Sequence, residues 1–135
     1  MTKALELEVR RRAGFRCEYC HVPEARFDFK HEIDHIIAQK HHGPTILSNL
    51  ALCCGDCNMH KGPNVAGVDP ETGQVVRLFN PREDRWDDHF RWDGAVLMGI
   101  TAIGRATIDV LAINLPVRIL ARRALAEEAH FDQQS

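Results

Sequence analysis

The feature that most constrains this chain is a pair of C-x-x-C segments that lie far apart in the sequence. The first pair is Cys17 and Cys20, and the second, Cys54 and Cys57, begins thirty-four residues beyond Cys20. A C-x-x-C turn holds two thiolates at about the spacing of two corners of a zinc tetrahedron. In a reducing compartment, two such pairs indicate zinc rather than disulfides. The spacing therefore predicts one structural Zn²⁺ site that fastens the first knuckle to a strand–helix corner.

The fifth cysteine, Cys53, directly precedes Cys54. Leu50 and Leu52 favour a short strand here, and neighbouring side chains of a strand point to opposite faces. We therefore expect Cys53 to face away from Cys54 and to be a small, buried apolar residue.

Length and composition fit a single domain over residues 1–135. The chain is 44% hydrophobic and 27% charged, which is ordinary for a globular protein. No apolar run reaches the roughly 18 residues that cross a bilayer, and acidic residues interrupt the apolar positions near the N-terminus. We expect a cytoplasmic protein without a membrane partner. Its net charge of −2 leaves any nucleic-acid contact to local clusters or to bound metal.

Apolar spacing and turn residues predict an α+β chain of short elements. The expected helices cover 3–12, 56–61, 102–113 and 114–129, and the expected extended segments cover 27–38, 50–54, 65–68 and 74–79. An Asp93-Gly94 hairpin separates the last two helices from the rest, and Asn114 is expected to cap the final helix. Four apolar residues of the two helices are expected in the core: Val110, Leu111, Leu120 and Leu125. Arg118 and Arg122 are expected on the opposite face.

An adjacent carboxylate and imidazole, Asp34 and His35, lie inside an isoleucine-rich extended run. In a strand their side chains diverge unless both meet a third group, such as a metal ion with a substrate phosphate. Asn58, at the start of a predicted short helix, offers a second oxygen ligand. Oxygen ligands of this kind favour Mg²⁺ or Mn²⁺.

Taken together, the motifs of residues 15–63 resemble the HNH endonuclease family. The motifs that carry the resemblance are, in chain order, Cys17/Cys20, Asp34-His35, Ser48-Asn49-Leu50, and Cys54/Cys57 followed by Asn58, Lys61 and Gly62. The resemblance implies a ββα-metal, treble-clef-like core with a Cys₄ zinc site, and metal-dependent cleavage of DNA with no small-molecule cofactor. Residues 64–131 are then expected to form a β-hairpin and two-helix extension that packs on this core.

The resemblance also implies roles for individual residues. His35 matches the general base, and Asn49 matches the residue that braces the loop between the strands and helps to orient that base. Asp34 and Asn58 match the ligands of the catalytic divalent ion, although the position of Asn58 is often His in other members. This departure leaves the choice of metal open, because two oxygen ligands favour Mg²⁺ whereas a histidine would admit Zn²⁺ or Ni²⁺ more readily.

Two basic residues are candidate contacts to phosphate. Lys61 lies three residues after Asn58 and shares its side of the predicted helix. Arg16 follows the first helix, in a basic segment whose alternative role is a solvated face. Two other functions fit the same sequence: a zinc module that binds nucleic acid without cutting it, and a protein-interaction domain that uses its apolar C-terminal helices.

Overall fold

A computed structural model describes residues 1–128 and divides the chain into two compact units, Met1–Val65 and Ala66–Ser135. The division falls close to the predicted boundary between core and extension, and the packing of one on the other stays a prediction. Residues 129–131 of the expected extension lie outside the described residues. Among the helices of residues 1–128, none is both long and apolar enough to cross a membrane.

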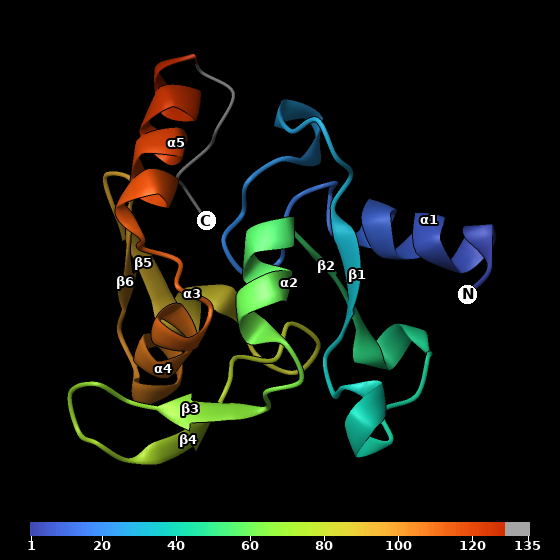
Figure 1. Cartoon of the computed structure of the whole chain (residues 1–135), viewed down its shortest axis with the longest axis horizontal. Coiled ribbons are helices and arrows are strands. Elements are labelled where there is room, and N and C mark those ends of the chain that lie inside the picture. The colour runs from blue at the N-terminus through green and yellow to red at the C-terminus, as the bar shows by residue number, and fades with distance from the viewer. Residues whose placement is uncertain (129–135) are drawn as a thin grey trace. The chain divides into compact units, whose positions relative to one another are not determined.

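The first unit is built around a short two-stranded sheet and a helix. Strands β1 (Glu32–His35) and β2 (Leu50–Cys53) pair antiparallel, so that Asp34 lies opposite Ala51. Helix α2 (Gly55–Lys61) follows β2 and contacts β1 (Figure 1). Helix α1 (Lys3–Arg12) precedes the sheet, and single 3₁₀ turns lie at Glu24–Arg26, Gln39–His41 and Leu47–Asn49.

Helix α1 supplies the apolar layer that covers β2. The hydroxyl of Thr2 caps the helix by accepting from the Leu5 amide, and Gly14, with φ +64°, follows its end. Val9 packs in a buried cluster with Leu50 and Leu52. The sequence therefore predicts this helix, β2 and α2 to within a residue or two.

The predicted extended segment over 27–38 is only partly a strand. β1 is four residues long because its partner β2 offers only four residues, between the 3₁₀ turn before Leu50 and the start of α2 after Cys53. Phe29 precedes the strand and is 85% exposed, although an alternating apolar pattern made it look like a strand residue.

The second unit consists of two hairpins and two longer helices. Its elements in chain order are β3 (Ala66–Val68), β4 (Val75–Arg77), α3 (Trp86–His89), β5 (Phe90–Asp93), β6 (Val96–Gly99), α4 (Ala102–Val110) and α5 (Pro116–Glu127). β3 pairs with β4 and β5 pairs with β6, and α4 packs on both hairpins. The turns of the hairpins use left-handed glycines, Gly73 at φ +75° and Gly94 at φ +59°. The second of these lies in the predicted Asp93-Gly94 hairpin.

The connection between α4 and α5 is where prediction and structure differ most. α4 ends at Val110 rather than at 113, and Ala112 adopts φ +49°. Asn114 does not cap α5; its side chain instead accepts from the Leu97 amide at 3.0 Å and donates to the Leu97 carbonyl at 2.7 Å. Leu115 occupies the N-cap position.

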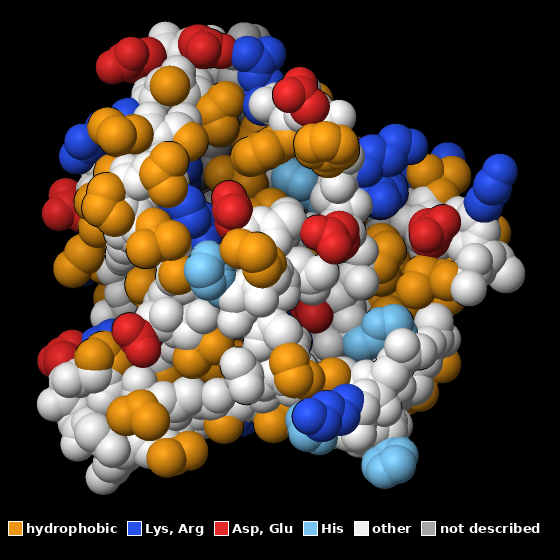
Figure 2. All heavy atoms as spheres, in the orientation of Figure 1, with side chains coloured by type: hydrophobic (Ala, Val, Ile, Leu, Met, Phe, Trp, Pro, Cys, Tyr) orange, Lys and Arg blue, Asp and Glu red, His pale blue; other side chains and the backbone are white. Residues whose placement is uncertain are grey.

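Helix α5 is amphipathic in the sense opposite to the prediction. Arg118 and Arg122 are buried, whereas Leu120 is 61% exposed and Val117 is 69% exposed. Leu111 is buried as predicted, and Val110 and Leu125 are half-buried. Hydrophobic side chains accordingly gather over the visible side of α5 (Figure 2).

Backbone carbonyls explain why the arginines point inward. Arg118 donates to the carbonyls of Leu111 at 2.7 Å and Ala112 at 3.0 Å. Arg122 donates at 2.9 Å to each of the carbonyls of Ala95 and Ile113. The end of a helix leaves carbonyls without helical partners, and a buried carbonyl needs a donor. Satisfying these groups outweighs the apolar periodicity of α5.

We predict that Arg122→Ala lowers the free energy of unfolding by about 3 kcal/mol, because it leaves several buried carbonyl groups without a hydrogen-bond donor. Leu120→Ala on the same helix is the matched control and should change it by less than about 0.5 kcal/mol, because the side chain is exposed. Both tryptophans, Trp86 and Trp92, lie in the second unit, so tryptophan fluorescence in a urea titration reports on this unit. A larger loss of stability in Leu120→Ala than in Arg122→Ala would contradict this structure and support the prediction that Leu120 is buried and Arg122 exposed.

Candidate functional site

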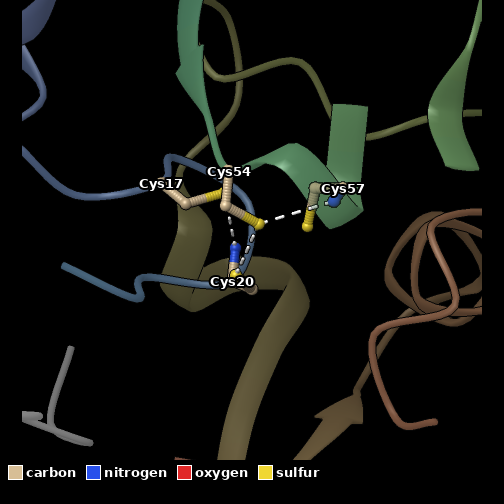
Figure 3. A group of neighbouring side chains, drawn as sticks. All are labelled: Cys17, Cys20, Cys54 and Cys57. Carbon is tan, nitrogen blue, oxygen red and sulfur yellow. Dashed lines mark hydrogen bonds between the residues drawn. The ribbon is translucent and has the colours of Figure 1, made fainter. Parts of the chain in front are cut away.

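The four cysteines of the two C-x-x-C pairs converge in the first unit. Their sulfur atoms all lie within 4.8 Å of one another, and all four residues are buried. Figure 3 shows Cys17 and Cys20 on the loop after α1, facing Cys54 and Cys57 at the β2–α2 corner. The Cys20 and Cys54 sulfurs are 3.7 Å apart, close to the edge of about 3.8 Å that a tetrahedron with Zn–S bonds of about 2.3 Å requires.

The surroundings of these four thiols favour a bound cation. Burial raises the pKa of Cys17 and Cys57, because a thiolate there has lost its water. Two backbone amides point at sulfur, that of Cys20 at 3.5 Å from the Cys17 sulfur and that of Cys57 at 3.4 Å from the Cys54 sulfur. Zinc binds thiolates and offsets their charge, so the cluster is compatible with a structural zinc ion. Cys53 is buried, as predicted, and is not one of this set of four, but its thiol interacts with those of Cys17 and Cys57.

Asp34 lies at the centre of a buried polar network. One carboxylate oxygen accepts from the Tyr19 hydroxyl at 2.8 Å, and the other accepts from the Lys61 ammonium at 3.2 Å. Asp34 is 4% exposed and Lys61 is 1% exposed. Burial raises the pKa of the Asp34 carboxyl, although Lys61 and Tyr19 act in the opposite direction. Apart from its position inside the first C-x-x-C pair, no sequence feature of Tyr19 predicts this contact.

The burial of Lys61 corrects its predicted contact with phosphate. Besides Asp34, its ammonium donates to the carbonyls of His35 at 3.4 Å and Ile36 at 3.2 Å. It is therefore held by three oxygen atoms inside the unit rather than presented to a ligand. An interior carboxylate that needs a counter-charge explains this placement.

His35 lies on the other side of the strand from Asp34. Asp34 is buried and His35 is half-exposed, as the alternation of a strand requires. The Nε2 atom of His35 is 2.9 Å from the hydroxyl oxygen of Thr45. The adjacent pair thus presents one solvent-accessible imidazole and one interior carboxylate.

Asn49 closes the loop that connects the strands. Its side-chain oxygen accepts from the Ile37 amide at 2.8 Å, and its side-chain nitrogen donates to the carbonyls of Ile37 at 3.0 Å and Pro44 at 2.9 Å. Gly43 permits this closure, because a Cβ atom there would lie 1.7 Å from the Ile37 carbonyl oxygen. Asn49 therefore ties both ends of the loop together.

The remaining candidates are less enclosed. Asn58, on α2, is half-buried, and its amide nitrogen donates to Glu32 at 3.1 Å. Glu32 is two residues before Asp34 and shares its face of β1, so α2 presents Asn58 and Lys61 to that face. Arg16 is half-buried and donates to the His21 carbonyl at 3.2 Å.

We predict that freshly purified protein contains one zinc ion per chain by elemental analysis. Cys57→Ser should lose that zinc and destabilise the first unit, because structural zinc contributes roughly 10–16 kcal/mol of apparent binding energy in zinc-finger peptides. Cys53→Ala is the matched control and should retain one zinc ion, since this thiol lies outside the four. Protein without zinc would remove the metal from the account.

Comparison with known proteins adds a family to this geometry. The HNH endonuclease family matches residues 17–64, which contain all four cysteines of the cluster together with Asp34, His35, Asn49 and Asn58. The Septu protein PtuB of Bacillus thuringiensis is 27% identical over 115 residues, which are 82% of this chain and 41% of that protein. This chain thus spans about two-fifths of the length of that relative. No solved structure matches the chain. Residues 17–64 of this chain are therefore similar to an HNH endonuclease domain.

Proposed function

We propose that this protein is a metal-dependent endonuclease that hydrolyses DNA phosphodiester bonds. The observation that carries the proposal is the half-exposed imidazole of His35, which lies beside a closed loop in a domain that matches HNH endonucleases. The order β1, β2, α2 with a four-cysteine cluster at the β2–α2 corner supports a ββα-metal core.

His35 is the proposed general base. Hydrolysis of a phosphodiester needs a water molecule that loses its proton as it attacks phosphorus, and an imidazole titrates near neutral pH. A base in this position contributes roughly 10²–10⁴-fold to the rate. The loop closed by Asn49 holds the neighbourhood of the imidazole in place, which limits the orientations that the ring samples.

Asp34 and Asn58 are the proposed ligands of a divalent ion. Because the Asn58 nitrogen donates to Glu32, its oxygen can serve a metal, and each Asp34 oxygen keeps a lone pair beyond its bond to Tyr19 or Lys61. This set of oxygen donors fits Mg²⁺ or Mn²⁺. Such an ion would supply Lewis-acid stabilisation of the charge that develops on the leaving oxygen.

One observation favours a second candidate function, a zinc-held module that binds nucleic acid without cutting it. The ammonium of Lys61 lies 3.2 Å from Asp34 and already supplies a positive charge to that carboxylate. If this ion pair were permanent, Asn58 would be left as the single proposed protein ligand of the divalent ion. The two candidates are separated by whether cleavage occurs and whether it depends on Asp34.

We predict that the parent protein cleaves supercoiled plasmid in Mg²⁺ or Mn²⁺ and that His35→Ala lowers the single-turnover rate at least 100-fold, because the general base is lost. His41→Ala, which changes an exposed histidine of the following loop, is the matched control and should keep the parental rate. Zinc content and DNA affinity should be unchanged in both variants. Cleavage by His35→Ala at the parental rate would overturn the proposed function.

We predict that Asp34→Asn and Asn58→Ala each raise the Mn²⁺ concentration for half-maximal cleavage by roughly tenfold or more. Mutation of residues that only support a metal ligand already lowers metal affinity by about this factor. His60→Ala, on the same helix as Asn58, should leave the Mn²⁺ dependence unchanged. If His60→Ala alone shifts the dependence, the ligand is His60 rather than Asn58. Unchanged cleavage in excess EDTA, with zinc retained, would exclude the second ion.

A further inference from the structure

The proposed base has a side-chain partner that neither the family match nor the sequence motifs assign. His35 Nε2 lies 2.9 Å from the hydroxyl oxygen of Thr45, and the side-chain nitrogen of Gln39 donates to the same oxygen at 3.5 Å. Thr45 is exposed, so its hydroxyl is not needed to satisfy a buried group of the core. The feature to be explained is its hydrogen bond to the imidazole of His35.

The loop that carries Thr45 is held on both sides. Asn49 donates to the carbonyl of Pro44, the residue directly before Thr45, and also binds Ile37, two residues after His35. The tight approach at Gly43 fixes the same segment. A chain of contacts therefore runs from Asn49 through the Pro44 carbonyl to Thr45, and from the Thr45 hydroxyl to His35. Within residues 1–128, Asn49 makes no direct hydrogen bond to the imidazole, so Thr45 is the link through which Asn49 reaches the ring.

The two ring nitrogens of histidine have different roles, and the bond made by one sets the state of the other. A neutral imidazole carries one proton, so a ring whose Nε2–H donates to Thr45 keeps its lone pair on Nδ1. Only that lone pair can accept a proton from water. If the hydroxyl instead donated to Nε2, Nδ1 would carry the ring proton and the base would be blocked.

We propose that Thr45 is a positioning residue: its hydroxyl accepts from His35 Nε2–H and thereby holds the ring in the tautomer and orientation in which Nδ1 acts as the base. This inference rests on the proposed function of His35. It assigns the effect of Asn49 on the base to a specific path through Thr45, and it assigns the reactive nitrogen as Nδ1.

The kinetic test uses three variants in the full chain. Thr45→Val keeps the size and branching of the side chain but removes the hydroxyl, and it should lower the single-turnover cleavage rate on the order of tenfold, a part of the contribution of the base. Thr45→Ser retains the hydroxyl and should restore most of the rate. Ser48→Ala removes another hydroxyl of the same loop and should keep the parental rate.

Coupling to Asn49 is tested by the double variant. If Asn49 acts through Thr45, adding Asn49→Ala to Thr45→Val should cost less than the product of the two single effects. Independent, multiplicative effects would overturn the path from Asn49 through Thr45.

A spectroscopic test does not depend on cleavage. In ¹⁵N NMR of the neutral ring, with the signals identified by their loss in His35→Ala, the parent should hold the proton on Nε2. Thr45→Val should move a measurable share of it to Nδ1, and Thr45→Ser should reverse that shift. An unchanged tautomer in Thr45→Val, or an unchanged cleavage rate while His35→Ala is inactive, would overturn this inference alone. Parental cleavage by His35→Ala would instead overturn the proposed function, and NMR would still report the Thr45 bond.

Discussion

The convergence of four buried thiols on one point is the constraint on which the first unit depends. It joins the loop after α1 to the β2–α2 corner, although the two lie far apart in the sequence. Tyr19 lies inside the first C-x-x-C pair and Lys61 lies one helical turn beyond Cys57, so the cluster also brings both partners of Asp34 to its carboxylate. The four-cysteine cluster thereby sets the environment of a carboxylate that is not part of it.

The strand β1 separates two chemical tasks by its own geometry. Its alternation sends Asp34 toward α2 and the interior, and leaves His35 half-exposed beside the loop that Asn49 closes. One face is therefore organised by charge and the other by hydrogen bonds to neutral groups. This division accounts for a motif in which an acid and an imidazole are adjacent in sequence yet have different partners.

Much of this arrangement could be predicted from the sequence, for reasons that are local. The spacing within each C-x-x-C pair, the left-handed glycines of the hairpins and the apolar face of α1 each require only nearby residues. Lys61 and Arg122 could not be predicted, because their burial is decided by acceptors far away in the chain, Asp34 for the former and Ala95 for the latter. From the sequence, Lys61 is expected to contact phosphate and Arg122 to lie on the face opposite the core, because apolar periodicity does not count unsatisfied oxygens. Thr45 was missed because nothing in its sequence neighbourhood shows that a loop returns it to His35.

The most direct test of the account is a crystal structure of His35→Ala with DNA and Mn²⁺, with anomalous diffraction measured at the zinc and manganese absorption edges. The account predicts two separate peaks, zinc among the four cysteine sulfurs and manganese on the oxygens of Asp34 and Asn58 beside a DNA phosphate. A manganese peak elsewhere, or none while the Lys61–Asp34 pair persists at the bound phosphate, would contradict it and favour the non-cleaving zinc module.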